Sequence, residues 1–353
     1  MVDGVRCMLM RGGTSKGAYF LAKDLPQDPA ERDDLLLRIM GSPDARQIDG
    51  IGGAHPLTSK VAVISPSTRA DADVDYLFLQ VGVEAAVVSD RQNCGNLLAG
   101  VGPFAVERGL VSSAPVRIHM VNSGSVATAN FPGSDGVVDY DGEVAIAGVP
   151  GTAAAVVLDF AETEGSATGA LLPTGNVTDV IEGITVTCID NGMPVIVVPA
   201  ASLGRTGYET VAELEADPDL GRRVRALRLA AGPLMGLGDV SAASVPKISL
   251  IAPPADGGTV CTGTFIPVRV HESIGVLGAI SVATALLLDG AAGADLADVK
   301  PGQARFDIEH PTGHLEVEAE VDTTTQPPTV TRSGVVRTAR KLFDGTVFPR
   351  RFR

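Results

Sequence analysis

Two apolar segments, one in each half of the chain, constrain the fold most strongly. Residues 94–109 are apolar on nearly every face, which predicts a helix buried on all sides rather than one lying on a surface. Asn93 is a good N-cap for this helix, and Gly109 is a good stop. The second segment, 274–288, is also mostly apolar but is too short to span a bilayer. Each helix therefore needs a surrounding layer of structure to bury it.

Cys94 stands where the first of these helices begins. The unpaired N–H groups and the positive end of the helix dipole favour a thiolate at such a position. The neighbouring Gly95 lets a ligand approach the backbone closely. Cys94 is therefore a candidate acid–base group. The alternative is a small inert core residue, since free cysteines are often buried.

A glycine-rich turn, 11–17, separates two short apolar strands at 7–10 and 18–21. It resembles a P-loop only superficially, because a P-loop needs lysine after glycine and here Lys16 precedes Gly17. Bare backbone N–H groups in such a turn still bind anions, so the turn is a candidate anion contact.

Lys60 begins an apolar strand directly after a second glycine-rich loop, 47–59. A charged lysine is costly to bury, so a lysine at this position can give up its proton and act as a base. The alternative is a solvated loop lysine, since lysine is rarely buried without a partner.

The second half of the chain repeats the order of the first. Strand, glycine turn and strand recur at 186–198, and the second buried helix follows. The number of residues between the turn and the helix is nearly equal in the two halves, as counting from Arg11 to Cys94 and from Gly192 to Ser273 shows. This repetition indicates an internal duplication.

The duplication predicts an α/β (α+β) fold of two pseudo-symmetric domains, each with a mixed sheet wrapped around one buried helix. We expect the domains at 1–183 and 184–353, with the last strand crossing to the first domain. Because ligand sites favour domain interfaces, both helix N-termini are expected to point into one cleft.

Charge and composition exclude several classes of partner. The 353 residues carry a formal net charge of −14, which disfavours nucleic acid. Hydrophobic residues make up 45% and charged residues 20%, values typical of a packed globular protein. The four cysteines are unclustered, and the N-terminus lacks the layout of a signal peptide. We therefore expect a cytoplasmic protein that does not enter membranes.

The histidines are not expected to form a metal site. His310 and His314 have the spacing of a helical ligand pair, but Pro311 and Gly313 forbid the helix. A cysteine hydrolase would need a histidine beside Cys94 that a third group orients, and no such partner is marked in the sequence. We therefore expect neither a metal nor another cofactor.

The remaining candidate groups are two helix N-termini, two glycine turns, one thiol and one amine. Helix N-termini bind carboxylates. A thiol and an amine can move protons at a carbon next to a carbonyl. These groups indicate a cofactor-free isomerase, epimerase or tautomerase of a small polycarboxylate. The competing class is a protein that binds such an acid without turning it over.

Five motifs, in the same order along the chain, resemble a known family. They lie at 10–17, 47–61, 92–96, 189–194 and 271–275. They resemble the 2-methylaconitate isomerase and 4-oxalomesaconate tautomerase/isomerase family, which has a diaminopimelate epimerase-like fold. The resemblance extends from about residue 7 to about residue 348. Segments 41–50, 74–80 and 171–176 are most similar to the oxalomesaconate branch, which serves gallate and protocatechuate degradation.

The resemblance implies roles for particular residues. Lys60 and Cys94 are expected to be the proton-transfer pair. Diaminopimelate epimerases use two cysteines, and the second falls at Ser273 here, so racemisation by two thiols is not expected. The expected substrate-binding residues are Arg11, Gly12, Gly13, Thr14, Ser15, Asn93, Gly95, Asn96, Met193, His271, Ser273, Ile274 and Gly275.

Two reactions share the same first step. After a proton leaves the carbon next to the keto group, protonation on oxygen gives the enol, which is tautomerisation. Protonation two carbons away gives the shifted alkene, which is a 1,3-allylic isomerisation of 4-oxalomesaconate or of 2-methylaconitate. The sequence does not separate these reactions, nor does it say which of Lys60 and Cys94 is the base. We expect tautomerisation of a small tricarboxylate-type substrate by a homodimer.

Overall fold

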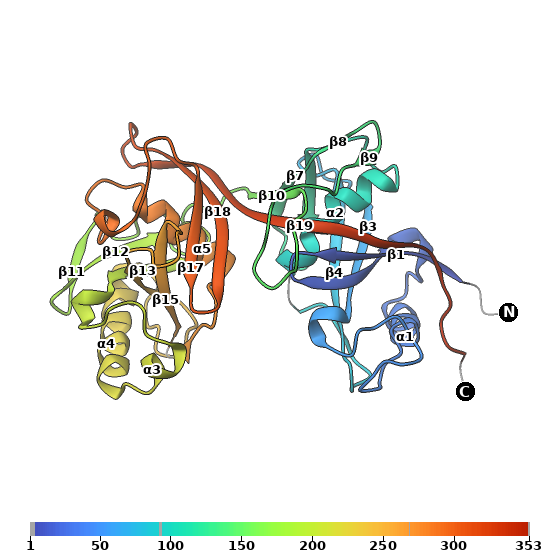
Figure 1. The fold of residues 1–353 in the computed structure, drawn as a ribbon, viewed down its shortest axis with the longest axis horizontal. Coiled ribbons are helices and arrows are strands. Elements are labelled where there is room, and N and C mark those ends of the chain that lie inside the picture. The colour runs from blue at the N-terminus through green and yellow to red at the C-terminus, as the bar shows by residue number, and fades with distance from the viewer. Residues whose placement is uncertain (1–3, 92–93, 268, 352–353) are drawn as a thin grey trace. The chain divides into compact units, whose positions relative to one another are not determined.

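The computed structural model describes residues 4–91, 94–267 and 269–351 (Figure 1). None of the helices in these ranges is long and apolar enough to cross a membrane.

The chain divides into two compact units. Unit 1 comprises Met1–Ala161 and Arg337–Arg353, and unit 2 comprises Glu162–Val336. The sequence places the division between 183 and 184, whereas the structure places it after Ala161. The difference arises because the segment that follows is bonded to the second half. The carboxylate of Asp190, for example, accepts the backbone N–H groups of two residues in the 162–183 segment, at 2.8 and 2.9 Å.

The described residues of unit 1 form two α-helices and a set of strands, besides short 3-10 turns. In chain order these are β1 (Val5–Gly12), β2 (Ser15–Leu21), α1 (Pro29–Met40), β3 (Lys60–Pro66), β4 (Val74–Val81), β5 (Val88–Ser89), α2 (Gly95–Glu107), β6 (Val116–Met120), β7 (Val126–Asn130), β8 (Gly133–Ser134), β9 (Val137–Val138), β10 (Ala155–Phe160) and the last part of β19 (Thr329–Val347). The predicted helix at 29–40 is confirmed, and so is the strand that Lys60 begins. The first glycine turn is shorter than predicted, because Lys16 and Gly17 belong to β2 and only two residues connect the strands.

The main sheet of unit 1 is mixed. β1 pairs with β2 antiparallel, β2 with β3 parallel, β3 with β4 antiparallel, and β4 with β6 parallel. β6, β7 and β10 then continue antiparallel, and both β1 and β10 are hydrogen-bonded to β19. The sheet therefore closes on itself.

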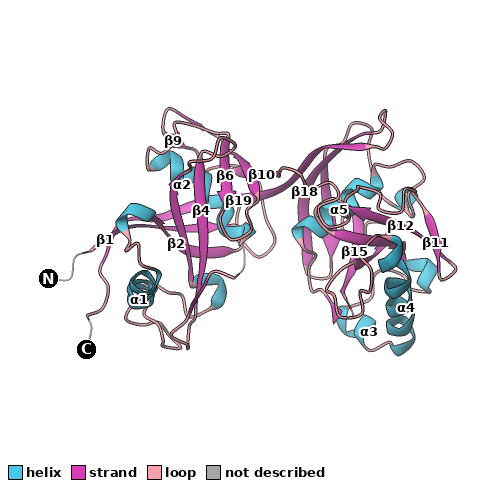
Figure 2. Cartoon of the chain, turned by 180° about the vertical axis from the view of Figure 1, so that it is seen from behind, coloured by secondary structure: helices cyan, strands magenta, loops and turns pink. Residues whose placement is uncertain are grey.

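The closed sheet surrounds α2 (Figures 1 and 2). All ten residues from Leu97 to Val106 are buried, as the apolar sequence predicts. Side chains alternate along each strand, so the residues that pack with α1 and those that face α2 occupy alternate positions. Ala18, Val61 and Leu79 belong to the core next to α1, so the residues immediately beside them in sequence face α2.

The C-terminal end of α2 is set by glycine, as predicted. Gly109 has φ +68°, a left-handed conformation that favours glycine. The N–H of Leu110 donates to the carbonyl of Ala105, and the N–H of Gly109 to that of Val106, so the last turn keeps its hydrogen bonds.

Unit 2 repeats this arrangement. Its elements are β11 (Asp179–Ile181), β12 (Ile184–Asp190), β13 (Pro194–Pro199), α3 (Val211–Glu215), α4 (Pro218–Leu234), β14 (Lys247–Ala252), β15 (Val260–Ile266), β16 (Arg269–Val270), α5 (Val276–Leu286), β17 (Arg305–His310), β18 (Gly313–Asp322) and the first part of β19. From β12 to β19 the pairings run antiparallel, parallel, antiparallel, parallel, antiparallel and antiparallel. This is the order found from β1 to β10, so the predicted duplication is confirmed.

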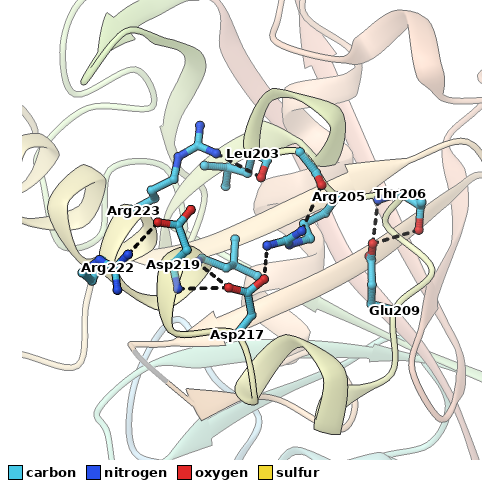
Figure 3. A network of polar contacts seen from close by, with 10 residues as sticks. Leu203, Arg205, Thr206, Glu209, Asp217, Asp219, Arg222 and Arg223 are labelled. Carbon is cyan, nitrogen blue, oxygen red and sulfur yellow. Dashed lines mark hydrogen bonds and ion pairs between the residues drawn. The ribbon is translucent and has the colours of Figure 1, made fainter.

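The helices of unit 2 differ in exposure. α5 is buried from Gly278 to Leu286, whereas α4 covers the opposite face of the sheet. The start of α4 is held by polar contacts (Figure 3). Asp217 accepts the N–H groups of Asp219 and Leu220 at 3.0 Å and pairs with Arg205. These caps satisfy N–H groups that the helix itself leaves unpaired.

Asn191 anchors the glycine turn between β12 and β13 to α5 by hydrogen bonds. It is fully buried, its N–H donates to Ser281 Oγ at 3.1 Å, and its Nδ2 donates to Thr284 Oγ1 at 2.8 Å. Its Oδ1 accepts the hydroxyls of Thr163 and Ser333 at 2.5 and 3.0 Å. The Asp-Asn-Gly motif therefore has a structural function at Asn191.

Replacing Asn191 with Asp is expected to lower the free energy of unfolding by about 2–4 kcal/mol. Thr284 donates its own proton to the Ile280 carbonyl at 2.7 Å, so a carboxylate oxygen would meet a lone pair on Thr284. Urea denaturation followed by circular dichroism measures the change. The control Thr284→Ser keeps the acceptor and should lose only about 1 kcal/mol, for one buried methyl. An unchanged urea midpoint for Asn191→Asp would contradict this function.

Candidate active site

Lys60 lies at the first position of β3 and is only 8% exposed. Its Nζ donates to Gln80 Oε1 at 2.8 Å and lies 5.0 Å from the centroid of the Phe78 ring. The orientation of the Gln80 amide is fixed because its Nε2 donates to the carbonyls of Pro56 and Ser59, both at 3.1 Å. The amine is therefore buried, not solvated, and it faces a neutral amide oxygen and an aromatic ring.

Cys94 is the N-cap of α2 and is 9% exposed. Its Sγ accepts the N–H of Leu97 at 3.5 Å, and its carbonyl accepts the hydroxyl of Tyr76 at 3.3 Å. The predicted N-cap, Asn93, lies outside the described residues. A Cβ added to Gly95 would meet no atom within 4 Å, so the backbone beside the thiol borders open space.

One strand connects these two groups. Tyr76, Phe78 and Gln80 occupy alternate positions of β4, so their side chains lie on one face of the sheet. Tyr76 contacts Cys94, whereas Phe78 and Gln80 hold Lys60. Lys60 and Cys94 therefore lie on the same face of the unit 1 sheet, the face that packs against α2.

The first glycine turn packs against the start of α2. A Cβ on Gly12 would lie 2.5 Å from the Asn96 carbonyl oxygen, and one on Gly13 would lie 2.3 Å from Asn96 Oδ1. Gly13 also has φ +51°, so only glycine fits there without strain. Asn96 Nδ2 donates to Thr14 Oγ1 at 3.0 Å. The turn and the helix N-terminus, which the sequence predicts as separate anion contacts, are thus neighbours.

Two further predicted residues lie at this turn. Arg11 Nη1 donates to the Gly13 carbonyl and to Thr338 of β19, at 2.9–3.1 Å, so it holds the turn in place. Burial and the nearby Arg340 lower the pKa of Arg11. Ser15 is 2% exposed, and its hydroxyl is one of the few buried side-chain atoms among the described residues that lack a hydrogen-bond partner. A buried hydroxyl without a partner is costly unless a ligand satisfies it.

Two tyrosines at the first turn of α2, Tyr19 and Tyr76, are buried and un-ionised. Tyr19 donates to the Leu97 carbonyl at 2.5 Å, as Tyr76 does to that of Cys94. Burial, with a further contribution from Cys94, raises the pKa of both tyrosines well above the usual value. Both hydroxyls therefore act as fixed donors to the first turn of α2 rather than as acids or bases.

The predicted residues of unit 2 gather at the start of α5. Gly275 is the N-cap and makes no side-chain cap, so the first N–H groups of the helix lack an intrahelical partner. The N–H of Ser273 donates to His271 Nδ1 at 2.9 Å and is not available to a ligand. Ile274 is buried, and the carbonyl of Met193 accepts the hydroxyl of Ser281 at 2.8 Å.

The sequence did not identify several residues that contact the predicted site residues or correspond to them in the other unit. Gln80 and Tyr76 could have been found from the period of two along 74–81, which places them on one face. Lys247 pairs with Val195 in unit 2 as Lys60 pairs with Gly17 in unit 1, so it is the structural counterpart of Lys60. Burial and Arg228 lower the pKa of Lys247.

Comparisons with known proteins agree with this structure. The family model described as "PrpF protein" matches residues 3–350. The chain is 56% identical over 352 residues to the (4E)-oxalomesaconate Delta-isomerase of Novosphingobium sp. strain KA1, and 98% of each chain is covered. It is 57% identical over 348 residues to the 4-oxalomesaconate tautomerase of Pseudomonas putida, covering 97% of this chain and 95% of that one.

A solved structure gives the same result for the fold. The crystal structure of methylitaconate-delta-isomerase matches with a TM-score of 0.87 and 34% sequence identity, over 99% of this chain and 96% of the other. The predicted fold class, a duplicated mixed α/β fold, is confirmed. The chain therefore belongs to the PrpF family, and the family resemblance of its motifs is confirmed.

Proposed function

We propose that this protein is a cofactor-independent isomerase of 4-oxalomesaconate, a small unsaturated keto-polycarboxylate, and that it acts as a keto–enol tautomerase. The observation that carries the proposal is the face of the unit 1 sheet that packs against α2, where Lys60 and Cys94 are connected through β4. Ser15, on β2, adds a buried hydroxyl without a hydrogen-bond partner. The names of the two relatives that are more than half identical support this substrate.

Substrate carboxylates bind at the start of α2 in this proposal. The N–H groups of Gly95 and Asn96 lie in the first turn, where the helix supplies no acceptor, and the glycine turn lies against them. The Ser15 hydroxyl gains a hydrogen-bond partner when a carboxylate binds. Such a site is local, so it works despite the net charge of −14.

Lys60, as the free amine, removes a proton from the carbon next to the keto group. Its hydrogen-bond partner Gln80 is a neutral amide that holds the nitrogen in place. The electron pair of the broken C–H bond stays on the substrate and delocalises onto the keto oxygen as a dienolate, which backbone N–H donors stabilise. A proton that Cys94 delivers to that oxygen completes the tautomerisation. A proton delivered two carbons away by Cys94 would complete the allylic alternative.

Proton NMR of 4-oxalomesaconate with the enzyme in deuterated water tests the proposal. We expect deuterium to enter at the carbon next to the ketone, with no migration of the alkene. Migration of the alkene would instead show the 1,3-allylic reaction. Absence of any exchange would refute the isomerase and leave a binding protein. Treatment with EDTA is expected to leave the exchange rate unchanged, and a loss of exchange would refute cofactor independence.

We also propose that the protein acts as a cytoplasmic homodimer in gallate or protocatechuate degradation. Its four cysteines are unpaired, as is usual in a reducing compartment, and symmetric dimers are the commonest assemblies. Sedimentation equilibrium measures the assembly, and a mass equal to the chain's 36.2 kDa would refute the dimer.

A further inference from the structure

Three cations lie side by side on neighbouring strands of unit 1. In the register of the antiparallel pairs, Arg11 of β1 is opposite Lys16 of β2 on one side and Arg340 of β19 on the other. Residues directly opposite each other in adjacent strands share one face of the sheet, with Cβ atoms about 5 Å apart. We call Lys16, Arg11 and Arg340 the basic row.

The positive charge of the basic row is not balanced by the chain. Like charges directly opposite one another are destabilising, and burial and Arg340 lower the pKa of Arg11. Among the described residues, no carboxylate forms an ion pair with a member of the row. Arg69 of the same unit, in contrast, pairs with Asp71 at 2.6 Å. The row is therefore able to attract an anion from solution.

The basic row lies next to the residues that contact the start of α2. Arg11 precedes Gly12, where a Cβ would lie 2.5 Å from the Asn96 carbonyl oxygen. Arg11 Nη1 also donates at 3.0 Å to the carbonyl of Gly13, which packs against Asn96 as well. Since side chains alternate along a strand, the row faces away from α2. Its charge therefore acts on the start of α2 through space, within roughly one Debye length, about 10 Å at 0.1 M salt.

The start of α2 depends on its surroundings for such a charge. The first turn has no acidic residue, and no side chain from Asn96 to Val106 is charged. In the proposed reaction Lys60 is the free amine, so it offers no net charge to the arriving substrate. The net charge of −14 meanwhile repels a polyanion at long range. Arginine keeps its proton, so two of the three charges in the row are permanent.

We propose that the basic row steers the substrate: Lys16, Arg11 and Arg340 raise the local concentration of a polycarboxylate at the start of α2 and favour anions of higher charge. This inference rests on the proposed function, because the anion that is steered is the substrate. It makes the three residues determinants of specificity that do not contact the substrate.

Two variants each remove one cation of the row, Arg340→Gln and Lys16→Gln. Neither side chain makes a hydrogen bond within the described part of the chain. At about 0.01 M salt we expect each variant to lower kcat/KM for 4-oxalomesaconate about 3-fold to 10-fold, the Coulomb effect in water of one cation on three carboxylates about 10 Å away. The value of kcat should stay within about twofold, because steering precedes the reaction. At about 1 M salt, where the Debye length is about 3 Å, the loss should disappear.

Two controls separate the position of the charge from its sign. Arg340→Lys keeps the cation and should keep kcat/KM within about twofold at low salt. Arg69→Gln changes the net charge by the same amount, but Arg69 lies beyond Pro66, at the end of β3 opposite Lys60 and about 20 Å away. It should leave kcat/KM unchanged. An equal loss in Arg69→Gln, a loss that persists at 1 M salt, or no loss in either row variant at low salt would overturn the proposal.

Binding of unreactive anions tests the charge dependence without turnover. Tricarballylate has three carboxylates and glutarate has two, and neither has an alkene or ketone to isomerise. By calorimetry at low salt, we expect Arg340→Gln to weaken tricarballylate more than glutarate, because the Coulomb energy grows with the charge of the ligand. Equal weakening of both would overturn the proposal.

The two kinds of measurement also separate this inference from the proposed function. A protein that binds tricarballylate in the expected pattern but leaves 4-oxalomesaconate unchanged would refute the proposed function and not the steering. Turnover of 4-oxalomesaconate that neither row variant alters at low salt would refute the steering alone.

Discussion

Replacing Lys60 with Met is expected to lower kcat for 4-oxalomesaconate by about 10²–10⁴, the usual contribution of a positioned base. The amine is buried against the Phe78 ring and held by Gln80, so a methionine of similar length fills the same space. Deuterium exchange next to the ketone should fall by the same factor, because removal of that proton is the step assigned to Lys60. Both rates can be read from one NMR time course.

Lys60→Arg is the matched variant. It places a cation at this position that can donate to Gln80, but arginine does not lose its proton in proteins. If Lys60 is the base, Arg is as inactive as Met. If Lys60 only attracts an anionic substrate, Arg retains most of the activity, and the assignment of the base is wrong.

Replacing Cys94 with Ala is expected to lower turnover by about 10²–10⁴, as for any positioned proton-transfer group. Exchange next to the ketone should persist, because Lys60 remains in place. Cys94 is the N-cap of α2 and receives the Leu97 N–H, so part of any loss can arise from the helix start. Cys94→Ser keeps a good N-cap and separates the two causes.

Cys261→Ser is the control for a thiol outside this site. Burial raises the pKa of Cys261 to about 11, so it is a neutral thiol at pH 8, and its replacement should leave turnover unchanged. If Cys94→Ala and Cys94→Ser both keep the wild-type rate, Cys94 transfers no proton in the reaction.

Much of the fold was predictable because its signals are local. The apolar segment before Gly109 predicts a buried helix, and the helix at Pro29–Met40 follows from its apolar spacing. The start of β3 at Lys60 and the repetition of the strand order could also be inferred from the sequence. The extent of the first glycine turn could not, because the pairing of Arg11 with Lys16 extends the strands through residues that on their own favour a turn.

The sequence alone determined the family, the duplicated fold and the two residues, Lys60 and Cys94, that we expect to move protons. Only the tertiary structure decided how the predicted site residues are held: Gln80 fixes the Lys60 amine, Asn96 contacts the glycine turn, and Ser273 lies within hydrogen-bond distance of His310. The physical reason is that each of these contacts joins segments distant in the chain. Strand register and helix packing bring such segments together, and a local pattern of residues does not encode either of them.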